Sequence, residues 1–243
     1  MHERLITLFH SFKALCFPPA CLLCAKALPA TDILICPSCL SQILLIRRPL
    51  CTCCGREFPN SAPGDHFCAK CLAKRPAFSM ARAVLQYNDD VATLVHSFKY
   101  AGKTYCHSTF AGLKARSLPA EDLATPEIII PVPLHRQRLR ERGFNQAVVL
   151  AALFFPDDKQ RIDVDVLIRT RWTPPQTGLS GKDRRQNLKN AFDVQKPEQV
   201  KGKSVLLIDD VLTTGTTINE CAKTLKKYGA IDVQALTLAR VVG

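Results

Sequence analysis

One stretch decides the fold of this chain: Val205-Leu206-Leu207-Ile208-Asp209-Asp210-Val211-Leu212-Thr213-Thr214-Gly215-Thr216-Thr217. It opens with four apolar residues, a run too short for a helix and typical of a buried β-strand. Two carboxylates end this strand, and a loop of hydroxyl residues with one glycine follows. Residues 218–228 then predict a helix, and Gly229 suits its C-terminal cap. With residues 233–238 as a second strand, this segment predicts a βαβ unit of a parallel sheet.

The loop after the predicted strand has the chemistry of an anion site. In open α/β sheets, ligands bind where parallel strands end, and helix N-termini favour anions. The hydroxyl and backbone N–H groups of residues 213–217 suit a phosphate, and Gly215 permits a close approach. Asp209 and Asp210 suit sugar hydroxyls, bound directly or through a divalent cation. A buried strand followed by an ordinary polar turn would explain the apolar run, but not the acid pair and the loop together.

The same stretch resembles the phosphoribosyl-diphosphate (PRPP) signature of type I phosphoribosyltransferases: a hydrophobic run, two acids and Thr-Thr-Gly-Thr-Thr. The resemblance implies an α/β fold with a central, mostly parallel sheet flanked by helices, and PRPP bound together with Mg²⁺. It implies that Asp209 and Asp210 are the catalytic pair and hold the ribose. The implied 5′-phosphate ligands are Thr213, Thr214, Gly215, Thr216 and Thr217.

Eight of the 12 cysteines form four Cys-x-x-Cys pairs, which are typical of zinc sites in a reducing cytosol. We therefore expect about two structural zinc ions per chain, four thiolates each, and a cytoplasmic protein. Sequential pairing of the turns is the simplest arrangement, and interleaved pairing stays open. A single pair is also compatible with buried or redox-active thiols, an alternative that four pairs in one segment disfavour. The expected ligands are Cys21, Cys24, Cys36, Cys39, Cys51, Cys54, Cys68 and Cys71.

Charge and hydropathy indicate which partners the protein binds and whether it has a transmembrane segment. The formal net charge is +12, which favours anionic partners such as PRPP or a related nucleotide, or nucleic acid. No segment approaches the length of apolar residues that a transmembrane helix needs. Residues 1–15 predict a short amphipathic helix rather than a signal peptide.

Two arginine-rich segments are candidates for the pyrophosphate site. After the predicted strand 127–133, residues 136–142 place four arginines in a loop expected at the same sheet edge as Asp209. Guanidinium groups bind phosphate in a bidentate manner, although a solvated basic loop is the simpler alternative. The polar, basic segment 169–192 resembles the mobile loop that closes over PRPP in type I phosphoribosyltransferases. The expected PRPP-binding cations are Lys99, Arg136, Arg138, Arg142 and Arg184.

Nearly the whole chain resembles the ComF/ComFC/GntX family. The resemblance lies in the cysteine module, the PRPP signature and four further motifs: Phe-Lys-Tyr-Ala-Gly at 98–102, Pro-Val-Pro-Leu-His at 131–135, Arg-Gly-Phe-Asn-Gln at 142–146 and Thr-Pro-Pro-Gln-Thr-Gly-Leu-Ser at 173–180. It implies an N-terminal helix with a double zinc ribbon over 1–78 and a phosphoribosyltransferase-like domain over 79–243. It also implies a link to natural competence, natural transformation, and DNA uptake and utilisation in bacteria.

Two functional hypotheses follow, and the sequence leaves both open. The first is a Mg²⁺-dependent phosphoribosyltransferase that acts on PRPP. The second is a competence factor that binds single-stranded DNA and whose PRPP site is regulatory or vestigial. Other competence or DNA-uptake proteins are further candidate partners.

Overall fold

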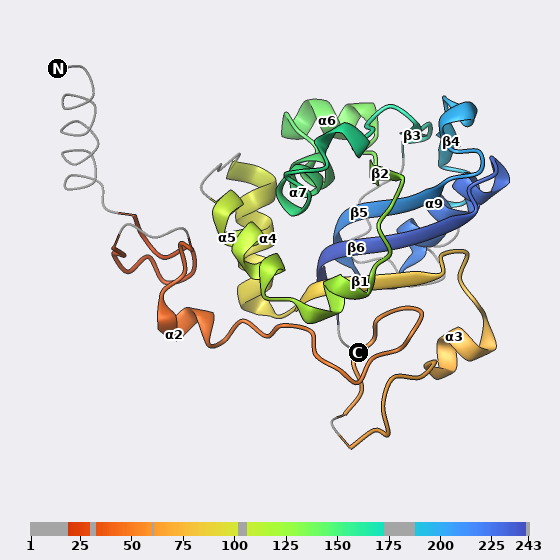
Figure 1. The fold of residues 1–243 in the computed structure, drawn as a ribbon. Coiled ribbons are helices and arrows are strands. Elements are labelled where there is room, and N and C mark those ends of the chain that lie inside the picture. Colours follow the sequence, from red (N-terminus) through yellow and green to blue (C-terminus); the bar gives the residue numbers. More distant parts are fainter. Residues whose placement is uncertain (1–18, 30–32, 60, 102–105, 173–187, 242–243) are drawn as a thin grey trace.

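A computed structural model describes residues 19–29, 33–59, 61–101, 106–172 and 188–241 of the chain (Figure 1). Its centre is a parallel sheet of four strands in the order β1-β6-β5-β2. These strands are β1 (Met80–Gln86), β2 (Ile128–Pro131), β5 (Ser204–Leu212) and β6 (Asp232–Arg240). A separate antiparallel pair consists of β3 (Leu167–Arg169) and β4 (Phe192–Val194).

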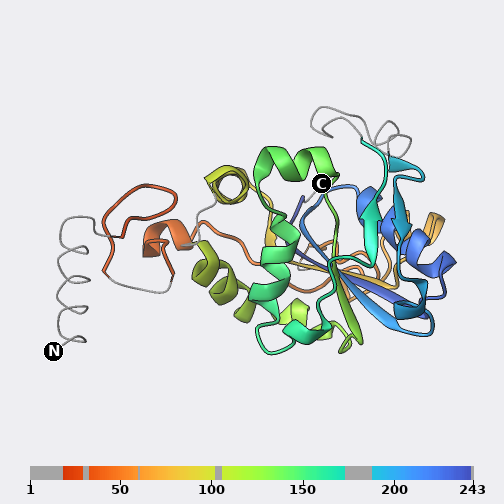
Figure 2. The same cartoon turned by 90° about the horizontal axis from the view of Figure 1, so that it is seen from above.

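Helices connect these strands and cover both faces of the sheet (Figures 1 and 2). Among the described residues, the α-helices of this part are α4 (Asp89–Ala101), α5 (Cys106–Ala115), α6 (Arg136–Arg142), α7 (Gln146–Phe154) and α9 (Thr216–Lys227). Short 3₁₀ helices are η1 (Leu118–Asp122), η2 (Lys159–Arg161) and η3 (Pro197–Gln199). The cysteine-rich part contains α2 (Pro37–Leu40) and α3 (Ala69–Ala73).

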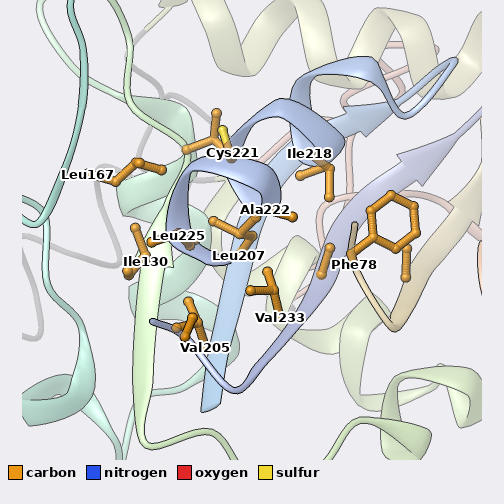
Figure 3. Packing of buried hydrophobic residues seen from close by; sticks show 14 of the residues in the cluster. Phe78, Ile130, Leu167, Val205, Leu207, Ile218, Cys221, Ala222, Leu225 and Val233 are labelled. Atoms are coloured by element: carbon orange, nitrogen blue, oxygen red, sulfur yellow. The ribbon is translucent and has the colours of Figure 1, made fainter. Parts of the chain in front are cut away.

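Strand β5 shows why the sheet is buried on both faces. Its alternate side chains point to opposite sides, because successive residues of a strand face opposite ways. Val205 and Leu207 pack in the core under α9, where Figure 3 shows them facing Leu225. Leu206 and Ile208 pack in a second core formed with α4, α5 and α7. A strand buried on both faces reads as a continuous apolar run, as this one does.

The βαβ unit predicted from the sequence is confirmed, with small shifts in its bounds. Strand β5 continues beyond Ile208 through both acids to Leu212. Helix α9 begins at Thr216, and Gly229 has the positive φ of +92° that suits a residue just beyond a helix end. The parallel α/β fold is therefore the observed one.

One local prediction was wrong. Residues 136–142 were expected to form a loop, but they form helix α6. The His135 side chain accepts a hydrogen bond from the Gln137 N–H, and Gly143 (φ +78°) ends the helix in the left-handed conformation. The N-terminus of α4 is capped by Asn88, whose side-chain oxygen accepts a hydrogen bond from the Val91 N–H at 2.9 Å.

The two cysteine-rich segments dock on different parts of the α/β core. The first lies beside α5, where the Leu34 N–H donates to Thr109 Oγ1 at 3.0 Å (Figure 1). The second packs below β1, where the Ala81 N–H donates to the Cys53 carbonyl at 2.7 Å. No helix in the described part of the chain is both long enough and apolar enough to span a bilayer.

Candidate functional site

An open cleft of about 1090 Å³ lies at the carboxyl ends of the central strands. It forms there because β2 and β5 are neighbours in parallel register, with Pro131 opposite Ile208. The segments that follow these two strands therefore leave the same edge of the sheet. The predicted site residues that line the cleft are Lys99, Arg138, Arg142, Asp209, Asp210, Thr213 and Thr217.

The two acids at the end of β5 differ in their surroundings. Asp210 Oδ2 forms an ion pair with Lys99 Nζ at 2.7 Å, which offsets its charge. Asp209 Oδ1 accepts a hydrogen bond from the Asp210 N–H at 2.9 Å. Burial of its carboxyl group, together with the nearby charge of Asp210, raises the pKa of Asp209 from 3.8 to about 7. The pair thus holds more negative charge than the apoprotein readily accommodates, which favours a ligand that supplies hydroxyl donors or a cation.

The loop after the acids presents the N-terminus of α9 toward this edge of the sheet. Gly215 has φ +75° and precedes the first helical residue, Thr216. The hydroxyl groups of Thr214 and Thr216 lie 2.8 Å apart and are hydrogen-bonded to each other. Thr213 and Thr217 line the cleft, while Thr214, Gly215 and Thr216 are not among its lining residues. A 12-residue helix that begins beside an open cleft provides the electrostatics of a phosphate site.

Helix α6 divides its four arginines between the cleft and the solvent. Arg138 and Arg142 are four residues apart, so they share one helix face, and both line the cleft. Arg142 Nη1 also donates to Gln146 Oε1 at 3.1 Å. Arg136 and Arg140 are exposed and lie outside the cleft lining. Arg184, the remaining predicted cation, lies outside the described residues.

The eight predicted cysteine ligands form two clusters of four, in which the Cys-x-x-Cys turns are paired sequentially. Cys21, Cys24, Cys36 and Cys39 make the first, and Cys51, Cys54, Cys68 and Cys71 make the second. Within each cluster all sulfur atoms lie within 4.8 Å of one another. The Cys24–Cys36 and Cys54–Cys68 sulfur distances are 3.7 and 3.8 Å.

These distances fit a zinc ion. Four sulfurs about 2.3 Å from a tetrahedral zinc are separated by about 3.8 Å. Backbone N–H groups also point at sulfur, since the Cys68 N–H lies 3.3 Å from Cys51 Sγ. Both clusters therefore suit closed, structural tetrathiolate sites.

Comparison with known proteins agrees with both halves of this description. A family model described as "Double zinc ribbon domain" matches residues 12–72, and one described as "Phosphoribosyl transferase domain" matches residues 142–241. "Competence protein F" of Haemophilus influenzae is 34% identical over 229 residues, which cover 90% of this chain and 96% of that protein. The chain belongs to the ComF family.

Other relatives of this ComF-family chain span it to a similar extent. "DNA utilization protein YhgH" of Escherichia coli O6:H1 is 33% identical over 93% of this chain and 98% of that protein. "Competence protein ComFC" of Bacillus subtilis is 30% identical over 86% of this chain and 85% of that protein. Among solved structures, a glutamine PRPP amidotransferase from B. subtilis aligns over 53% of this chain and 25% of that chain, with 18% identity and a TM-score of 0.35.

Two residues that the sequence-based site did not include, an arginine and an asparagine, also line the cleft of this ComF-family chain. Arg169, at the end of β3, lines the cleft, and burial and the charge of Arg138 lower the pKa of its guanidinium. Asn145 also lines it, caps α7 by accepting from the Ala147 N–H, and donates to the Val132 carbonyl at 3.0 Å. Arg169 opened the predicted basic segment, and Asn145 stood in the Arg-Gly-Phe-Asn-Gln motif, so both had a signal in the sequence.

Proposed function

We propose that this ComF-family protein is a cytoplasmic, PRPP-binding phosphoribosyltransferase-like protein that serves DNA uptake and utilisation. One observation carries the proposal: an acid pair, a threonine loop at a helix N-terminus and guanidinium groups meet in one cleft. PRPP presents the matching groups, namely ribose hydroxyls, a 5′-phosphate and a pyrophosphate. The names of the relatives from H. influenzae, E. coli and B. subtilis support the link to competence and DNA utilisation.

Each part of the cleft has a role in this proposal. Asp209 and Asp210 hold the ribose hydroxyls and the magnesium that accompanies PRPP. Residues 213–217 and the start of α9 hold the 5′-phosphate. Arg138, Arg142 and Lys99 neutralise the pyrophosphate, and Mg²⁺ supplies further positive charge there when it is bound.

The reaction class that suits this arrangement is phosphoribosyl transfer. An acceptor forms a bond to the anomeric carbon while the bond to pyrophosphate breaks, so the leaving group carries away the electron pair. Positioning and stabilisation of charge are sufficient for such a step, and no protein nucleophile is required. We propose that residues 79–243 carry this site and that residues 1–78 form the zinc-binding part.

Binding of single-stranded DNA is a second candidate function. The observation that favours it is the exposure of Arg136 and Arg140 on α6, outside the cleft, in a chain of net charge +12. These two guanidinium groups remain accessible when the other two face a small ligand. Contacts of this kind bind the phosphate backbone without sequence preference and weaken steeply with salt.

Paired arginine variants separate the two candidates. Arg138→Gln with Arg142→Gln is expected to weaken PRPP binding in the presence of Mg²⁺ by about 10-fold or more, because charge-assisted hydrogen bonds to phosphate are lost. Arg136→Gln with Arg140→Gln is the matched control on the same helix and is expected to leave PRPP affinity unchanged. Isothermal titration measures both. Equal losses in the two pairs would mean that the cleft face of α6 has no special role.

The same two pairs test DNA binding. Fluorescence anisotropy of a labelled oligonucleotide at low salt is expected to show weaker binding for Arg136→Gln with Arg140→Gln. If wild-type protein does not bind the oligonucleotide at low salt, the second candidate function is wrong, whereas the titration with PRPP is unaffected by that result.

A further inference from the structure

Arg240, the last residue of β6, joins the α/β core to the second cysteine cluster. Its Nη1 donates to the Cys54 carbonyl at 2.8 Å, and its Nη2 donates to Cys54 Sγ at 3.6 Å. The two residues are 186 positions apart in the chain. A planar guanidinium can make both contacts at once, which a single ammonium group cannot do equally well.

The charge of the cluster explains why this contact matters. Four thiolates and one Zn²⁺ together carry a net charge of about −2. Cys51, Cys68 and Cys71 are buried and Cys54 is partly buried, so solvent screens this charge poorly. A cation that donates a hydrogen bond to one of the sulfurs offsets the charge and fixes the ligand's orientation. Arg240 is placed to do both.

The first cluster is held differently. Among the residues that the structure describes, the hydrogen bonds recorded for its sulfurs come from its own ribbon, such as the Cys36 N–H to Cys21 Sγ at 3.4 Å and Ser38 Oγ to Cys36 Sγ at 3.1 Å. Cys24 of this cluster is exposed. The two zinc sites therefore differ in what supports them: both have local N–H contacts to sulfur, and the second adds a contact from a residue of the phosphoribosyltransferase half.

The main chain of Arg240 extends the connection to the cleft. Its carbonyl accepts a hydrogen bond from the Tyr87 N–H at 2.7 Å, and the Val241 N–H donates to the Leu212 carbonyl at 3.0 Å. Tyr87 and Val241 both line the cleft. One residue thus contacts a zinc ligand through its side chain and the cleft wall through its backbone.

We propose that Arg240 is a positioning residue of the second zinc site, which holds the Cys54 thiolate and fastens that site to the cleft edge of the sheet. This role is independent of the ligand that the cleft binds. It makes retention of the second zinc dependent on the last strand of the phosphoribosyltransferase half, while retention of the first zinc is not.

Zinc release from the intact chain tests the proposal. Loss of a supporting contact of this kind typically lowers metal affinity by about 10- to 100-fold. We expect Arg240→Gln to transfer one of its two zinc ions to a chromogenic chelator about 10- to 100-fold faster than wild type. Arg240→Lys keeps the charge but not the paired contacts, so we expect an intermediate rate. Arg47→Gln, an exposed arginine between the two cysteine clusters, is the matched control and should match wild type.

Two further readouts identify the site that is affected. Alkylation followed by mass mapping should show Cys51, Cys54, Cys68 and Cys71 becoming reactive in Arg240→Gln, with the reactivity of the first cluster unchanged. In Co²⁺-substituted protein, the thiolate charge-transfer band should move to lower energy in Arg240→Gln, because a positive charge near sulfur stabilises its electrons. The proposal is wrong if zinc release and alkylation of Arg240→Gln match wild type, or if both increase equally in the two clusters. It is also wrong if the thiolate charge-transfer band does not move in either Arg240→Gln or Arg240→Lys.

Discussion

Replacement of Asp209 by asparagine should stabilise the protein in the absence of ligand. The carboxyl group of Asp209 lies beside Asp210 at the end of β5, and its pKa is raised from 3.8 to about 7. A carboxyl group whose pKa is raised by folding weakens the folded state as the pH rises from its unfolded pKa to its folded pKa. The penalty is therefore nearly absent at pH 4 and complete above pH 7.

The size of the effect follows from the shift. A rise of this extent corresponds to roughly 4 kcal/mol if the carboxyl group were fully shielded from solvent. Asp209 is only partly buried by exposed area and borders an open cleft, so we expect about 1–2 kcal/mol after screening. Asparagine is close in shape and uncharged, so it removes the penalty. For a domain of this size, the gain corresponds to a rise in Tm of about 2–6 °C.

Thermal unfolding of Asp209→Asn and wild type at several pH values measures this gain. The buffers contain neither magnesium nor a chelator, because magnesium would stabilise the acid pair and a chelator would remove zinc. The gain should be largest near pH 8 and should shrink toward pH 5. Asp210→Asn is the comparison: it removes one cause of the raised pKa of Asp209 but also the ion pair with Lys99, so its gain should be smaller than that of Asp209→Asn. A destabilised Asp209→Asn protein at pH 8, or a gain independent of pH, would refute the reasoning.

Two other predictions concern the cysteine clusters and their attachment. Protein purified without added zinc should contain about two zinc ions per chain by elemental analysis; a ratio near zero in folded protein would contradict the two tetrathiolate sites. Gly55→Ala should lower Tm by more than Gly143→Ala, because a Cβ at Gly55 would lie 2.4 Å from the Ala81 carbonyl oxygen, whereas at Gly143 it meets nothing within 4 Å. Both glycines have positive φ, +67° and +78°, so the conformational cost is shared, and equal changes in Tm would show that the second ribbon does not pack tightly on β1.

Local sequence patterns predicted much of this architecture. The apolar run of β5 and its acid pair predicted the central strand, and the four Cys-x-x-Cys turns predicted the zinc clusters. These signals are reliable because each depends on residues that are close in the chain. The strand order β1-β6-β5-β2 brings the segments after β2 and β5 to one edge, as the sequence had led us to expect for Arg138 and Asp209.

The rest depends on contacts that the local pattern does not encode. The four arginines of residues 136–142 suggested a phosphate-binding loop, but arginine and leucine favour helices, and His135 and Gly143 cap this helix. The contact of Arg240 with Cys54 joins residues 186 positions apart. Arg169 enters the cleft only because β3 pairs with β4 beside α9. Such placements follow from tertiary packing.

The central claim is that the acid pair of β5 holds a PRPP-like ligand in the cleft. Isothermal titration of PRPP with Mg²⁺ into Asp209→Asn with Asp210→Asn, beside wild-type protein, tests it most directly. We predict measurable binding to wild type and at least about 10-fold weaker binding to the double variant, since charged hydrogen bonds to the ribose hydroxyls are lost. A folded double variant that binds PRPP as tightly as wild type would contradict the claim.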